Sequence, residues 1–257
     1  MNEENLNKAR ALYYGMFSRC FVFTTDNSRY FELTGYLDTL SQNPLDKPSA
    51  EAFATLKELV KSDSNVDFML EFDEIFHSPE TQTVRVTASY YDENIESGKK
   101  RIEMQNFLAK TKIRRDEKTY SDYEDHIGFI FAVMSELSNL IADGQTEYKN
   151  TAHCIFEQIL NEFIDEFSRE LYEHESAKIF KNIVILLKSF IEFERVYLEV
   201  NTPVLKAKPV LSEIKEELSD EERERRAKNK LLRAQGPKKQ ESGSCELNPS
   251  YEVEEDF

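Results

Sequence analysis

An acid–histidine segment stands near the middle of the chain, where Glu124, Asp125 and His126 follow one another just before a long apolar stretch. Neighbouring carboxylates and an imidazole are the groups that general acid–base catalysis uses. The same segment could instead begin a helix, because Ser121 and Glu124 have the spacing of a capping box and acidic residues stabilise a helix's first turn. This second interpretation explains the carboxylates well and His126 poorly, so both stay open at this point.

Catalysis at this segment lacks the partners that it would need. No serine or cysteine stands in a recognisable nucleophile elbow, and the sequence has no glycine-rich phosphate-binding loop. The other histidines, His77, His153 and His174, have neither the HExxH spacing nor that of a metal finger. The 3 cysteines are far apart and form no CxxC pair. We therefore expect no catalytic residue, no metal site and no cofactor.

Charge and composition narrow the class of partner and the compartment. The formal net charge of −16 disfavours nucleic acid, whose phosphates would be repelled, and suits either a basic partner or simple solubility. The amino-terminal residues include acids where a signal peptide has a basic region, and the longest aliphatic run, 183–187, is far too short to span a bilayer. We expect a cytoplasmic protein without stable membrane insertion.

Apolar residues recur at helical spacing along most of the chain, and only 7 Gly and 7 Pro interrupt them. This pattern predicts an all-α fold, a single bundle in which the most apolar helix, 176–200, is central. Ser49 is the predicted cap of the third helix. The segment 83–91 is β-branched and alternating, yet it has no evident strand partner, so we expect an extended connector. The predicted helices cover residues 6–21, 31–40, 49–60, 68–76, 97–112, 127–141, 155–171 and 176–200.

The last part of the chain differs in composition from the rest. From 204 to 257 there are 11 basic and 13 acidic residues and few large apolar ones. This change predicts a helical domain over 1–203 and a charged extension over 204–257. Within the extension, a capping box predicts a short helix near 219–233, and we expect disorder elsewhere.

Two short motifs carry a resemblance to a known family. Phe72–Pro79 matches a Tyr/Phe-x-x-Leu/Ile-Phe-x-x-Pro pattern, and Asp125–Ile127 matches the later part of a Pro-Asp-His-Ile pattern, with Glu124 in place of the proline. Arg10–Tyr14 fits an amino-terminal Arg-x-x-x-Tyr pattern. In these features the chain resembles the TorD/DmsD/NarJ family, cytoplasmic chaperones for molybdenum-containing redox enzymes.

The resemblance implies a TorD-like helical fold and a precursor enzyme as partner. That precursor would carry a twin-arginine signal peptide, which the chaperone would bind, with or without the apoenzyme, until the molybdenum cofactor is inserted. A formate dehydrogenase is the client that we favour. Two arginines followed by an apolar helix call for carboxylates beside an apolar groove. The predicted client-binding residues are Glu124, Asp125, His126, Tyr123, Phe76, Tyr90 and Glu136.

Two other classes of function stay in view. The chain could be a helical protein–protein adaptor without an export role, or, third, a hydrolase that uses His126. Twin-arginine peptide binding separates the chaperone from the adaptor. The sequence leaves the oligomeric state open.

Overall fold

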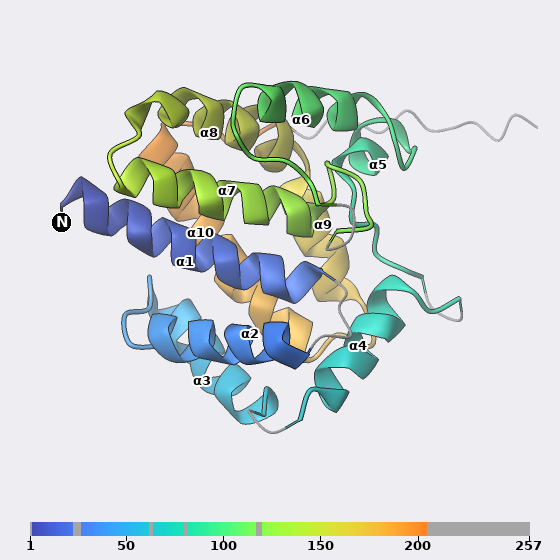
Figure 1. The fold of residues 1–257 in the computed structure, drawn as a ribbon. Helices are drawn as coiled ribbons and strands as arrows, with labels where there is room; N and C mark the ends of the chain where they lie inside the picture. The colour runs from blue at the N-terminus through green and yellow to red at the C-terminus, as the bar shows by residue number, and fades with distance from the viewer. Residues whose placement is uncertain (1, 23–26, 62–63, 80–81, 117–119, 205–257) are drawn as a thin grey trace, which may run out of the picture. The chain divides into compact units, whose positions relative to one another are not determined.

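The computed structural model describes residues 2–22, 27–61, 64–79, 82–116 and 120–204, which form helices joined by short connections (Figure 1). Within these ranges there is no strand, and one isolated antiparallel bridge joins Thr87 to His126. The predicted all-α fold is confirmed. The α-helices are α1 (Glu3–Phe21), α2 (Asn27–Leu40), α3 (Lys47–Leu59), α4 (Val66–Phe76), α5 (Ala88–Glu93), α6 (Lys99–Ala109), α7 (Ile127–Ala142), α8 (Lys149–Ile155), α9 (Asn161–Glu173) and α10 (Ile179–Leu198).

The predicted charged extension lies almost wholly outside the described residues. The helix predicted near 219–233 falls there as well, so the division at 203 stays a prediction. Thr146–Tyr148 forms a 3₁₀ turn before α8, and Phe156–Leu160 forms a π turn between α8 and α9.

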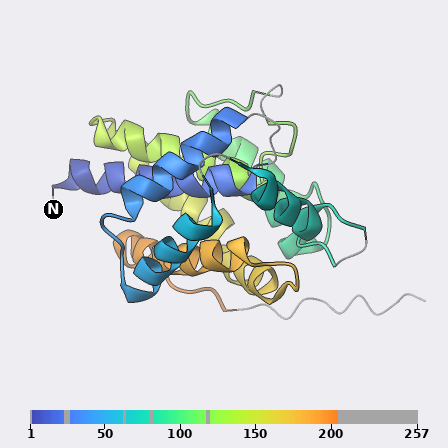
Figure 2. The same cartoon turned by 90° about the horizontal axis from the view of Figure 1, so that it is seen from below.

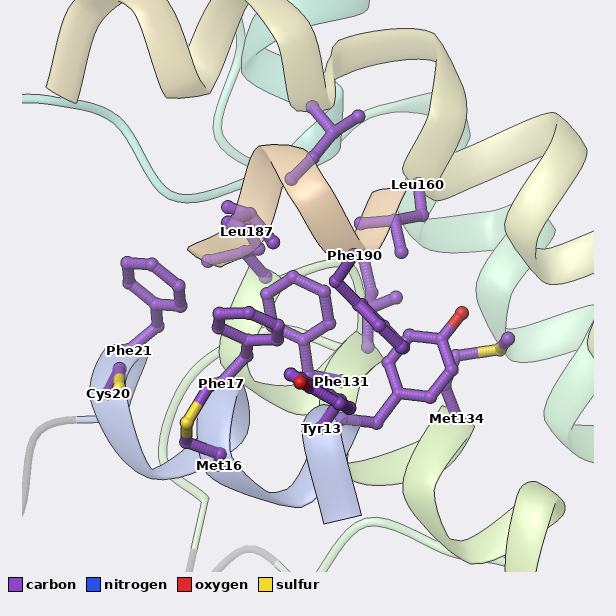
Figure 3. Close-up of a cluster of buried hydrophobic side chains, with 14 of the residues drawn as sticks. Tyr13, Met16, Phe17, Cys20, Phe21, Phe131, Met134, Leu160, Leu187 and Phe190 are labelled. Atoms are coloured by element: carbon purple, nitrogen blue, oxygen red, sulfur yellow. The ribbon is translucent and has the colours of Figure 1, made fainter. Parts of the chain in front are cut away.

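The core forms where α1 and α7 run side by side with α10 beneath them (Figures 1 and 2). Aromatic side chains fill the space between the three helices, as the close-up in Figure 3 shows. Phe17 of α1 lies 5.5 Å from Phe131 of α7 and 5.7 Å from Phe190 of α10, measured between ring centroids. Tyr13 stacks on Phe190 at 4.9 Å. Such pairs add to the free energy gained by burying the rings, so this cluster joins the three helices.

The beginning of α10 is held by a carboxylate from another helix. Glu71 of α4 accepts hydrogen bonds from the backbone N–H groups of Lys178, Ile179 and Phe180, at 2.7, 3.0 and 2.8 Å. These N–H groups have no partner within the helix, and a negative charge suits the positive end of its dipole. The predicted central helix contacts α1, α3, α4 and α9, and Glu71 fixes where it starts.

A buried ion pair joins the first helix to the last. Arg10 donates from Nε and Nη2 to the two carboxylate oxygens of Glu194, at 2.6 and 2.7 Å, and the Tyr14 hydroxyl donates to Oε2 at 2.6 Å. The ring of Tyr197 lies 4.4 Å from the guanidinium carbon. Burial by itself would lower the pKa of Arg10, but the hydrogen bonds and charge of Glu194 outweigh it and raise that pKa. The Arg10–Tyr14 motif is therefore structural.

Two local predictions were wrong. Asp46, not Ser49, is the N-cap of α3: Asp46 accepts from the Ser49 N–H at 2.7 Å, while Ser49 Oγ accepts from the Asp46 N–H at 2.9 Å. Only the first part of the predicted 83–91 connector is extended, because α5 begins at Ala88. The carboxylate of Asp125 accepts a hydrogen bond from a backbone N–H group in the first turn of α5. A prediction from β propensity uses neighbouring residues alone and does not include such a contact.

Candidate functional site

The acid–histidine segment is held by backbone pairing with the residues at the start of α5 and just before it. The N–H of Ala88 donates to the carbonyl of Asp125 at 3.0 Å, and the N–H of Ile127 donates to the carbonyl of Val86 at 2.8 Å. These bonds enclose the bridge between Thr87 and His126. The site therefore lies where α5, α6 and the start of α7 come together (Figure 1).

Asp125 is fully buried and serves the start of α5. Its Oδ2 accepts a hydrogen bond from the backbone N–H of Ser89 at 2.9 Å, in the first turn of that helix. Its Oδ1 has no hydrogen-bond partner among the described residues. Burial raises the pKa of Asp125, and the hydrogen bond from Ser89 acts in the opposite direction. Asp125 thus fastens two segments together and exposes no carboxylate surface to a ligand.

His126 is the N-cap of α7. Its Nδ1 accepts a hydrogen bond from the backbone N–H of Gly128 at 3.1 Å, so Nδ1 carries no proton and the ring is neutral. Burial lowers the pKa of His126, which favours this neutral form. The cap is thus an imidazole, where the sequence offered a Ser121–Glu124 capping box. The histidine that the helix-start interpretation left unexplained is the residue that makes the cap.

Gly128 permits the close approach of α1 to the start of α7. A Cβ at this position would lie 2.5 Å from Cγ2 of Val22 and 3.1 Å from the backbone carbonyl of Phe21. No rearrangement of a flexible side chain alone could accommodate it, since one of these contacts is backbone. The site is thereby packed directly against the end of α1.

Glu124 binds two arginines of its own chain. Arg101 of α6 donates from Nε to Oε2 at 2.7 Å, and Arg115 donates from Nε to Oε1 at 3.1 Å. Burial by itself would raise the pKa of Glu124, but the hydrogen bond from Arg101 and the charges of both arginines outweigh it and lower that pKa. Glu124 is therefore an ionised carboxylate with a guanidinium on each oxygen.

The remaining predicted site residues are only partly brought together. Tyr123 is exposed, and its ring lies 4.3 Å from the guanidinium carbon of Arg101, so it belongs to the Glu124 cluster. Tyr90 is half-buried and packs under Arg85 at 5.4 Å. Phe76 is half-buried and packs against the core, with its ring centroid 4.7 Å from that of Phe72.

Glu136 does not join the cluster. It is exposed on α7, nine residues beyond Ile127, which corresponds to about 13 Å along the helix axis.

Arg101 and Arg115 were missed in the sequence analysis. The basic residues before the segment were visible, but nothing in their spacing indicates that they converge on one carboxylate. Arg101 lies on α6, 23 residues before Glu124, which is in the connection before α7. Glu124 was predicted to bind a client, and in the structure its two oxygens accept from Arg101 and Arg115.

The described ranges contain no group of three or more His, Cys, Asp or Glu side chains that could hold a metal ion. None of the helices within those same ranges is long and apolar enough to cross a membrane.

Comparison with known proteins identifies the family of this chain. The family model described as nitrate reductase delta subunit matches residues 42–169. The matched range runs from the connection after α2 into α9 and contains both Phe72–Pro79 and Asp125–Ile127. The chain belongs to this family. The family comprises NarJ- and TorD-like chaperones, so the protein is a molybdoenzyme maturation chaperone that interacts with molybdoenzyme precursors. No curated protein matches the sequence significantly.

Proposed function

We propose that this chaperone binds the twin-arginine signal peptide and the apo form of a molybdenum redox enzyme in the cytoplasm, and that it supports cofactor insertion before export. A formate dehydrogenase is the proposed client. The family supports the general role, and the net charge of −16 favours association with a basic segment.

One observation carries the proposal: the Glu124 carboxylate binds two guanidinium groups at once, with Nε atoms at 2.7 and 3.1 Å. A site that reads a pair of adjacent arginines needs a fixed carboxylate that can accept from two guanidinium donors, and arginine is suited to such contacts because its donors form a rigid fork. The exposed ring of Tyr123 adds a face on which a guanidinium can stack.

In this proposal the three residues of the acid–histidine segment have different roles. Glu124 and Tyr123 contact the client. Asp125 and His126 are buried, and they hold the segment in place through the Ser89 and Gly128 N–H groups. Replacing Asp125 or His126 would then lower client binding by moving Glu124.

The apolar part of the client needs more surface than Phe76 offers, because that ring is half-buried against Phe72 and Phe180. Val66 and Leu70 lie one turn apart on the outer face of α4, with 56% and 59% of their surface exposed. Beside them is a depression of about 290 Å³ whose lining includes the apolar Leu59, Leu70 and Ile179, the acidic Asp67, Glu71 and Glu74, and Lys178. We propose this face of α4 as the contact for the apolar helix of the signal peptide.

Peptide binding tests the function. Fluorescence anisotropy with a labelled twin-arginine signal peptide should show binding that weakens when the two arginines are replaced by lysines, since lysine cannot make the forked contact. Replacing Val66 and Leu70 together by serine should weaken binding of the same peptide while the thermal unfolding curve stays nearly unchanged, because both side chains are exposed. If no such peptide binds and no apoenzyme is recovered in pull-downs, the helical adaptor without an export role becomes the better interpretation.

A further inference from the structure

Glu124 is covered by the arginines that it binds. Its side chain is 11% exposed, against 13% for Arg115 and 27% for Arg101. Each carboxylate oxygen already accepts from one Nε atom. A guanidinium from a client therefore cannot reach Glu124 while both internal arginines stay in place.

We propose that Arg101 and Arg115 are built-in competitors of the client, and that Glu124 binds a client's arginine pair by exchanging it for its own. This inference rests on the proposed function and names how the site is regulated. The internal pair neutralises the Glu124 carboxylate in the free chaperone. A single arginine or lysine of another protein then binds too weakly to displace both internal arginines.

The other contacts of the two arginines make the exchange feasible. Arg101 also donates to Ser97 Oγ at 2.9 Å and lies over the ring of Tyr123. Arg115 also donates to the carbonyls of Tyr120 and Asp122, both at 2.9 Å. A displaced guanidinium therefore keeps hydrogen-bond acceptors near its present position, so it would not be left buried and unpaired.

The internal arginines lower the affinity for the peptide because they are tethered beside Glu124. Arginines held on the same chain compete at a high effective concentration, so a free peptide binds more weakly than it would to an open carboxylate. Removing the competitors should therefore strengthen binding, although it makes no new contact with the peptide.

The test replaces both internal arginines by glutamine and measures the affinity for a fluorescein-labelled peptide that carries two adjacent arginines before an apolar segment. Arg101→Gln with Arg115→Gln should bind this peptide about five- to tenfold tighter than the wild type. The control variant is Arg114→Gln with Arg169→Gln, which changes the net charge equally. Arg114 donates to the carbonyls of Leu108, Thr111 and Ile113, and Arg169 lies beside Glu166 and Glu173. The control should change the affinity less than about twofold, since these are surface charges.

The preference for arginine over lysine in the peptide gives a second readout. Glu124→Gln should remove that preference, because the forked contact needs both carboxylate oxygens. If the double variant unfolds, as circular dichroism would show, Arg101→Gln alone serves, because Arg101 is the more exposed of the two; it should tighten binding about two- to threefold.

The two proposals can fail separately. If the wild type binds the peptide and the arginine variants bind no tighter than the control, the exchange is refuted, and the contact of Glu124 with the client is refuted with it. The chaperone function then stands with the peptide bound at another surface. If neither the wild type nor any variant binds the peptide, and no apoenzyme is recovered, both proposals are refuted.

Discussion

Replacing Glu194 by glutamine should destabilise the fold more than any surface substitution. The change is nearly isosteric, but it removes the negative charge that Arg10 and Tyr14 share in the core. The side chain of Arg10 is 2% exposed and that of Glu194 is 0% exposed, so Arg10 would remain buried without a counter-charge. Breaking a buried pair from one side costs about 3–5 kcal/mol of unfolding free energy. For a protein of this size that corresponds to a fall in Tm of roughly 6–20 °C.

Urea unfolding followed by circular dichroism would measure this cost, with a double variant as the comparison. Arg10→Met together with Glu194→Leu removes both charges and should destabilise less than Glu194→Gln alone, because no unpaired charge is then buried. The Tyr14 hydroxyl loses its acceptor in the double variant, so full stability should not return.

Two results would refute the reasoning. A cost of less than about 1 kcal/mol for Glu194→Gln would mean that Arg10 finds water or another acceptor. If the cost of the double variant equals the sum of the costs of Arg10→Met alone and Glu194→Leu alone, the two residues are not coupled. A third measurement concerns function: below its unfolding transition, Glu194→Gln should bind a twin-arginine peptide as the wild type does, because the pair lies away from Glu124.

Two further predictions concern the site. The pKa of His126 is lowered in the folded state, whereas an unfolded histidine takes up a proton near its ordinary pKa of about 6.5. The free energy of unfolding should therefore fall as the pH drops from 7 to 5.5, by at most about 1.4 kcal/mol per pH unit. In His126→Asn, which can still cap the helix, urea unfolding at several pH values should show a shallower slope, and an unchanged slope would contradict the role given to His126. Gly128→Ala should lower the free energy of unfolding by about 1–3 kcal/mol, because its Cβ meets Val22 and the Phe21 backbone. The control Gly35→Ala, whose Cβ meets nothing within 4 Å, should be neutral or stabilising by about 0.5–1 kcal/mol. Equal losses at the two positions would count against the close packing of α1 on α7.

Much of the fold could be predicted because helical periodicity is local. The apolar spacing that places Phe17, Phe131 and Phe190 on the inner faces of their helices can be read within a few turns of sequence. The start of α5 could not be predicted in this way, because the carboxylate that satisfies Ser89 comes from Asp125, 36 positions later. The cap of α3 was missed by three residues, since Asp46 and Ser49 both fit a cap and only their reciprocal hydrogen bonds decide which one is the N-cap.

The candidate site divides in the same way. The sequence by itself determined the all-α class, the acid–histidine segment and the family, because each depends on residue types at short spacing. Only the tertiary structure decided what those residues do. It buries Asp125 and His126, whose side chains accept from N–H groups in the first turns of α5 and α7. It also packs Phe76 against the core and brings Arg101 and Arg115 onto Glu124. The physical reason is that a charge's role depends on which opposite charge lies within a few ångströms and on how much water remains around it, and both are set by helices far apart in the chain.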